Sequence, residues 1–163
     1  VKNKRKSLLL LGDYFFQNTH KMLSLLDGCF NEIEEKYTVI IKFHPAMIID
    51  KVYLKKLDYQ TSDRPISELL LSSDVAFTSN ISASALDAYC YGLPVVSLRD
   101  PKLLNRSVLS NAEEISFVNS ADELRDALIC MYPMNRNIVS RDYLLLDKNL
   151  SSWKRILGYG ANI

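Results

Sequence analysis

The stretch DVAFTSNISASALDAYCYGLPVVSL, residues 74–98, decides the fold expected for this chain. It opens with the apolar run Asp74–Thr78 and closes with the aliphatic run Leu93–Leu98, and each predicts a buried strand. Between them, Ser79–Tyr91 predicts a helix that Gly92 ends, because glycine is favoured just beyond the last helical residue. Two buried strands joined by a helix predict a parallel β-α-β unit.

The same alternation extends over the rest of the chain. Further strands are expected at Ser7–Leu11, Thr38–His44, Asp58–Thr61 and Ile115–Val118. Helices are expected at Asn18–Lys36, Ile48–Leu57, Ile66–Ser73, Leu103–Leu109, Ser120–Met131 and Ser151–Leu157, with Ser120 and Glu123 spaced as a capping box. The sequence therefore predicts an α/β fold, a doubly wound parallel sheet of about six strands in three α/β/α layers.

Composition describes one ordinary domain, which is expected over residues 7–133. Residues 1–6 are expected to be a linker remnant of a longer protein, and residues 134–163 a helical tail that packs on the domain. The chain has 163 residues with 20 Lys+Arg and 19 Asp+Glu, and this neutral balance argues against nucleic acid as a partner. A hydrophobic content of 48% excludes disorder, and no apolar run has the roughly 20 residues of a membrane span.

The three cysteines lack the spacing of metal ligands. Cys29, Cys90 and Cys130 lie far apart in apolar contexts and are expected to be small buried thiols. Free thiols suit a reducing compartment, so a cytoplasmic location is expected.

Ligands of doubly wound sheets bind beyond the carboxyl ends of the strands, where the strand order reverses. Those ends are Gly12-Asp13, His44-Pro45, Ser79–Ser84 and Arg99-Asp100. The richest is Ser79–Ser84, because hydroxyls, an amide and backbone N–H groups at a helix start bind phosphate well. N-capping of that helix is the alternative interpretation.

Two further residues are candidates for ligand contacts. His44 ends an expected strand beside the serine cluster, where an imidazole N–H can stabilise a phosphate; a structural histidine is the alternative. Asp87 lies one turn into the expected helix, where a carboxylate can accept hydrogen bonds from ribose; a solvent-facing Asp is the alternative. The chain has no GxGxxG, GxxxxGK[ST] or GxSxG motif, and its only other histidine is His20.

Three segments resemble the C-terminal, donor-binding domain of GT-B glycosyltransferases: IKFHP at 41–45, SDVAFTS at 73–79 and SASALDAYCYGLPVV at 82–96. The last is similar to the acidic-x4-Gly-x-Pro-Val-Val pattern of that superfamily. A His-Pro motif with a serine-rich motif most resembles bacterial sialyl- and polysialyltransferases, capsule Kdo transferases and teichoic-acid glycerophosphate transferases. Those enzymes use CMP- or CDP-activated donors. The resemblance covers roughly residues 7–131, and it implies that the domain expected over residues 7–133 is a nucleotide-sugar-binding Rossmann-like unit.

The resemblance implies a role for each matched residue. His44 with Pro45 would contact the donor phosphate, and His44 would help the nucleotide leave. Ser82 and Ser84 would hold that phosphate together with Ser79 and Asn80, Asp87 would take the ribose hydroxyls, and Gly12 would let the first loop approach the donor closely. Position 79 is Ser where retaining members with two spaced glutamates have Glu, which disfavours that branch.

The resemblance also implies partners for this part of the chain. The donor is a nucleotide-activated sugar, with UDP as the alternative to CMP or CDP, and neither a metal nor another cofactor is expected. The general base would lie on an N-terminal acceptor-binding domain of the same protein, which would make bacterial surface carbohydrate at the inner face of the membrane. The isolated fragment is expected to bind nucleotide without turnover.

Other functions stay open at this point. A GT-B-fold epimerase would need additional acidic residues around the donor. A flavodoxin-like signalling module would need an acidic cluster, a central Asp and a late Lys, of which the chain offers Asp13. A non-catalytic nucleotide- or sugar-binding domain is the third alternative.

Overall fold

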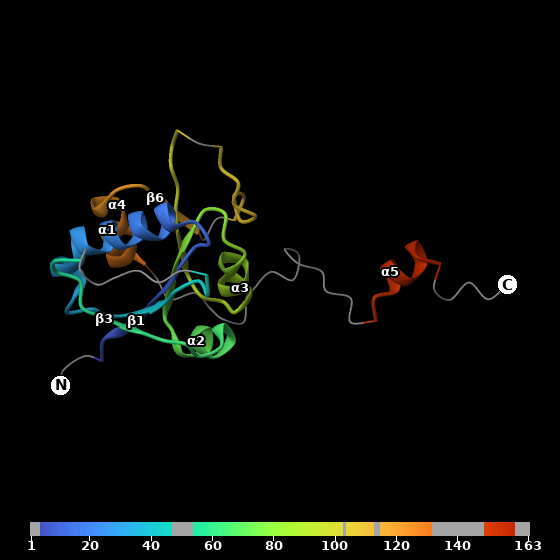
Figure 1. Ribbon diagram of the computed structural model, residues 1–163, viewed down its shortest axis with the longest axis horizontal. Coiled ribbons are helices and arrows are strands. Elements are labelled where there is room, and N and C mark those ends of the chain that lie inside the picture. Colours follow the sequence, from blue (N-terminus) through green and yellow to red (C-terminus); the bar gives the residue numbers. More distant parts are fainter. Residues whose placement is uncertain (1–3, 47–53, 103, 113–114, 132–148, 159–163) are drawn as a thin grey trace.

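The computed structural model describes residues 4–46, 54–102, 104–112, 115–131 and 149–158. Within these residues, six parallel strands form one sheet in the order β3-β2-β1-β4-β5-β6 (Figure 1). The strands are β1 (Lys6–Leu11), β2 (Tyr37–Lys42), β3 (Tyr59–Thr61), β4 (Val75–Ser79), β5 (Val95–Leu98) and β6 (Ile115–Val118). The predicted doubly wound parallel sheet is confirmed.

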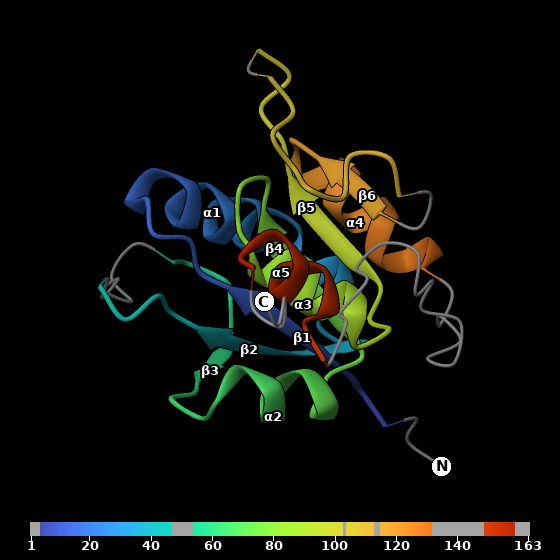
Figure 2. The same cartoon turned by 90° about the vertical axis from the view of Figure 1, so that its right-hand side faces the viewer.

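Helices cover both faces of this sheet (Figures 1 and 2). Leu8 and Leu10 of β1 belong to the core shared with α1 (Phe16–Ile33) and α4 (Ala121–Cys130). Leu9 and Leu11 belong to the core on the opposite face, shared with α2 (Ile66–Ser72) and α3 (Ser84–Cys90). Successive side chains of a strand point to opposite faces, so a central strand with helices on both sides is apolar at every position. The three-layer arrangement is confirmed.

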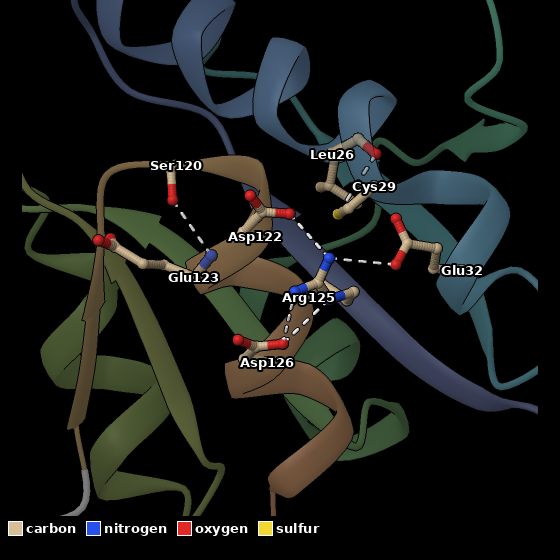
Figure 3. A network of polar contacts seen from close by, with 8 residues as sticks. All are labelled: Leu26, Cys29, Glu32, Ser120, Asp122, Glu123, Arg125 and Asp126. Carbon is tan, nitrogen blue, oxygen red and sulfur yellow. Dashed lines mark hydrogen bonds and ion pairs between the residues drawn. The ribbon is translucent and has the colours of Figure 1, made fainter.

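Polar contacts between α1 and α4 surround Arg125 (Figure 3). Its guanidinium lies 3.2 Å from Glu32 of α1 and also pairs with Asp122 and Asp126 of its own helix at 2.7 and 2.9 Å. Close to it, Cys29 donates to the carbonyl of Leu26, and burial raises the pKa of this thiol to about 11. Arg125 therefore links α4 to α1 through an ion pair, next to a thiol that stays un-ionised.

Only one of the three cysteines fits the expectation of a buried thiol. Cys29 is buried, whereas Cys90 is half-buried and Cys130 is exposed, and all three are free. The expectation was wrong for Cys130 because only Leu124 and Leu128 are buried in α4, while Ile129 and Cys130 at its end are exposed.

Several predicted boundaries differ from the structure. The helix expected from Ser79 begins only at Ser84, because Asn80–Ala83 form a turn, although it does end before Gly92, which has φ +73°. Residues 54–57 and 104–109 contain no helix; the rest of the two helices expected there, residues 48–53 and 103, lies outside the described residues. In both segments bends and turns replace the helix.

The described residues near the two ends of the chain bear on the expected linker and tail. β1 begins at Lys6, the last residue of the expected linker, and residues 1–3 lie outside the described residues. The expected final helix is present as α5 (Ser151–Ile156), none of whose residues is buried. That the tail packs on the domain stays a prediction. No helix among the described residues is long and apolar enough to cross a membrane.

Candidate functional site

A cavity of about 470 Å³ opens at the carboxyl ends of β1 and β2, beside the turn that follows β4. From β1 the chain winds toward β2 and β3, whereas from β4 it winds toward β5 and β6, so β1 and β4 mark the switch point of the sheet. The cavity is lined by Leu11–Phe15, Lys42–Pro45, Ile66 and Ile81–Ser84. It therefore unites five of the predicted site residues: Gly12, His44, Pro45, Ser82 and Ser84.

Gly12 brings the end of β1 against the end of β2. A Cβ at this position would lie 3.2 Å from the backbone nitrogen of His44, 3.2 Å from the Cα of Phe43 and 3.3 Å from the carbonyl oxygen of Lys42. The Gly12 N–H donates to that same carbonyl at 2.9 Å. The observed close approach is thus between two backbones of the protein, and it sets the position of His44.

The imidazole of His44 is held on both sides by its neighbours. Its Nδ1 accepts a hydrogen bond from the backbone N–H of Ala46 at 3.2 Å, and its ring meets Tyr14 edge to face, with centroids 5.4 Å apart. An Nδ1 that accepts leaves the proton of the neutral ring on Nε2. His44 therefore offers an Nε2–H donor at the cavity.

Ser82 and Ser84 form a hydroxyl pair with an Oγ–Oγ distance of 2.5 Å. Ser82 also accepts the N–H of Ser84 with its Oγ and the N–H of Ala85 with its carbonyl. These backbone groups are the ones expected to bind an anion, so the capping alternative accounts for part of the cluster. In a hydroxyl pair one hydrogen bridges the two oxygens and the other is free, which leaves one O–H donor for a ligand.

Asp13 is the central residue that the sequence reasoning did not assign. Its side chain is buried, with Oδ1 accepting the N–H of Phe15 and Oδ2 accepting both the amide of Asn18 and the hydroxyl of Ser79. The carboxylate thereby joins the loop after β1 to the end of β4 across the switch point. The sequence signal for Asp13 was an acidic residue that directly follows a buried strand and a glycine.

Ser79 and Asn80 face a second cavity of about 370 Å³, which shares Ile81 with the first. Ser79 is buried, and its hydroxyl donates to Asp13, so it helps to hold the Asp13 side chain in place. The Oδ1 of Asn80 is buried and has no hydrogen-bond partner among the described residues. Around these two lie polar and charged side chains of other elements: Asn18, Lys21, Asp100 and Arg106.

Asp87 is the predicted residue that the structure does not bring to either cavity. It lies exposed on α3, as its solvent-facing alternative required, and its ribose-binding role stays a prediction. In the part of the chain that the structure describes, no three His, Cys, Asp or Glu side chains group closely enough to hold a metal ion.

Two aromatic residues of the cavity were also missed. Tyr14 and Phe15 follow Asp13 in the loop after β1 and line the wall beside His44. The signal was an aromatic run, Tyr14-Phe15-Phe16, placed directly after a strand at the ligand-binding edge of the sheet.

No family model and no curated protein sequence matches this chain. Solved structures share its fold. The glycosyltransferase SnogD from Streptomyces nogalater has a TM-score of 0.58 and 14% identity, over 86% of this chain and 37% of its own. The glycotransferase of kitacinnamycin has a TM-score of 0.55 and 14% identity, over 95% of this chain and 38% of its own.

The solution structure of ALG13 matches over most of both chains. Its TM-score is 0.55 at 13% identity, over 86% of this chain and 96% of ALG13. The chain spans less than two fifths of SnogD and of the kitacinnamycin glycotransferase. At sequence identities of 13–14%, the likeness to all three structures shows the fold alone. The chain therefore has the Rossmann-like fold found in part of these glycosyltransferases, as expected for one half of a GT-B fold.

Proposed function

We propose that this chain is the donor-binding part of a glycosyltransferase that takes a sugar from a nucleotide-activated donor. The observation that carries the proposal is the first cavity, where residues from three separate strand ends meet at the switch point. Gly12, His44 and the Ser82–Ser84 pair, which the sequence alone predicts as site residues, all line the same space. The shared fold with glycosyltransferases supports the same proposal.

The cavity offers hydrogen-bond donors suited to a phosphate. The Nε2–H of His44 and the free hydroxyl hydrogen of the Ser82–Ser84 pair would donate to the donor's phosphate oxygens. During transfer, the acceptor oxygen attacks the anomeric carbon, and the bond from that carbon to the phosphate oxygen breaks. Its electron pair stays on the leaving nucleotide, so donors already placed at the phosphate stabilise the charge that develops.

The wider setting of the reaction extends this proposal. A His-Pro motif and a serine motif favour CMP or CDP donors over UDP. The general base that takes the acceptor's proton would lie on a second domain of the same protein, acting in bacterial surface carbohydrate synthesis at the inner face of the membrane. This chain alone would bind nucleotide without turnover, and a longer protein that binds but does not transfer radiolabelled sugar from CMP-sugars would indicate a non-catalytic binding domain.

Calorimetric titration of the chain with CMP, CDP and UDP tests the proposal. We expect at least one to bind, and His44→Ala to weaken that binding by roughly 10- to 100-fold, the effect of losing a hydrogen bond to a charged group. His20→Ala is the matched control, because this second histidine packs on Phe16 and lines neither cavity. Failure of all three nucleotides to bind at millimolar concentration would refute the proposal. Wild-type affinity in His44→Ala would remove His44 from the site.

A further inference from the structure

Three consecutive aromatic side chains stand exposed after β1. Tyr14 is 63% exposed, Phe15 52% and Phe16 47%. Exposed aromatic surface that is continuous along the chain is typical of a contact site, because hydrophobic side chains gain free energy when they leave water.

The backbone that carries these side chains is fixed. The buried carboxylate of Asp13 accepts the N–H of Phe15 at 2.9 Å, and the carbonyl of Phe15 accepts the N–H groups of Asn18 and Thr19 at 3.1 and 3.3 Å. The hydroxyl of Thr19 in turn accepts the N–H of Asp13 at 2.8 Å. The loop that carries the aromatic rings is therefore held by hydrogen bonds at Asp13 and Phe15, the residues on either side of Tyr14. Binding would need little further ordering of this backbone.

Two of the three rings belong to the cavity. Tyr14 and Phe15 line it, whereas Phe16 packs on His20 outside it. Tyr14 meets Phe15 edge to face with centroids 5.5 Å apart, and meets His44 in the same way at 5.4 Å. The aromatic wall thus continues directly into the imidazole that would hold the phosphate.

We propose that Tyr14 and Phe15 bind the apolar face of the donor's sugar ring and so help to select the sugar. This inference rests on the proposed function. A sugar ring that contacts Tyr14 would lie next to a phosphate that contacts His44, and in a nucleotide-sugar these two groups are joined through one oxygen. The base is separated from the phosphate by the whole ribose. Aromatic faces beside hydroxyl and imidazole donors also match the two sides of a sugar, its C–H face and its hydroxyls.

The test compares nucleotides with nucleotide-sugars on the whole chain. Dissociation constants are measured for UDP with UDP-glucose and UDP-N-acetylglucosamine, and for CMP with CMP-N-acetylneuraminate. The double variant Tyr14→Ala/Phe15→Ala should weaken binding of a nucleotide-sugar by roughly tenfold and leave its nucleotide unchanged, as expected for losing two aromatic contacts. Tyr14→Phe, which keeps the ring, should bind as wild type does, and so should Phe16→Ala, the neighbouring aromatic outside the cavity.

The outcomes separate this inference from the proposal on which it rests. A wild-type chain that binds no nucleotide refutes both. Three results overturn the inference alone: an equal loss for nucleotide and nucleotide-sugar, which would place the base on the aromatic wall; no loss for either; or a wild-type chain that binds nucleotides but no nucleotide-sugar of the panel. Unchanged thermal unfolding of the double variant shows that any loss is local, as expected for two exposed side chains.

Discussion

At the scale of single residues, Gly12 is the position where the site depends on an absent side chain. Gly12→Ala would place a methyl group 3.2–3.3 Å from three backbone atoms of residues 42–44, which can give way only by moving the strand end. We expect this overpacking to lower the free energy of unfolding by about 1–3 kcal/mol and to weaken nucleotide binding, because His44 shifts with its backbone. Urea unfolding and calorimetry measure the two effects. Unchanged values for both would mean that the two strand ends separate freely.

Asp13 is the residue through which the two sides of the switch point are connected. In Asp13→Asn, an amide NH2 replaces one oxygen and either faces the Asn18 and Ser79 donors or displaces the Phe15 N–H bond. We expect a loss of about 1–3 kcal/mol in the free energy of unfolding, since buried donors are left without an acceptor. Ser79→Ala removes a single donor and should cost less. Equal losses in the two variants would contradict a central role for the carboxylate.

The residues that sequence could and could not identify differ in how their roles arise. His44, Ser82 and Ser84 were predicted because the sequence alone shows which polar residues follow the carboxyl ends of buried strands. Asp13 and Ser79 act through a bond between residues 66 positions apart, which appears only when β1 and β4 pair. Tyr14 and Phe15 were not predicted, because the sequence does not show whether an aromatic run packs in the core or is exposed on a loop, as it is here.

At the scale of elements, α4 begins where its capping residues placed it. The Oγ of Ser120 accepts the N–H of Glu123 at 3.1 Å (Figure 3). The Glu123 carboxylate in turn accepts the N–H of Asn119 at 2.6 Å. Ser120→Ala should therefore lower the free energy of unfolding by about 1 kcal/mol, while Ser120→Asp, which restores an acceptor, should recover most of it. Urea unfolding of the two variants decides this. Equal stability of Ser120→Ala and wild type would show that tertiary packing alone fixes the start of α4.

The elements that were predicted well are those with long apolar patterns. Apolar runs predict the strands β1, β4 and β5, and apolar periodicity predicts the helices α1 and α4. The sheet and its two cores require these patterns. The start of α3 did not, because Ser79–Ala83 carry good capping residues at several positions and the chain uses them for a turn. Local polar residues show that a helix begins nearby, and tertiary contacts select the exact position.

At the scale of the whole molecule, the lateral order of the strands creates the site. The alternation of strands and helices predicts a parallel sheet, but it leaves open which strands are neighbours, because that depends on pairing between distant segments. The observed order 3-2-1-4-5-6 is the one typical of Rossmann folds, whereas flavodoxin-like sheets have the order 2-1-3-4-5. The difference is β3, a three-residue strand at the edge beyond β2. This order counts against the flavodoxin-like alternative.

A ligand at the switch point should stabilise the whole fold, since it contacts segments that follow β1, β2 and β4 at once. A nucleotide present at a hundredfold excess over its dissociation constant adds about 2.7 kcal/mol to the free energy of unfolding. For a chain of this length, that raises the midpoint of thermal unfolding by roughly 5–10 °C. At the same nucleotide concentration, His44→Ala should shift by about half as much or less, because a tenfold weaker complex contributes about 1.4 kcal/mol and a still weaker one contributes less. Calorimetric scans of both proteins with and without nucleotide measure the difference. A shift of equal size in the variant would place the ligand away from His44, and a shift absent from both would mean that the nucleotide does not bind preferentially to the folded chain.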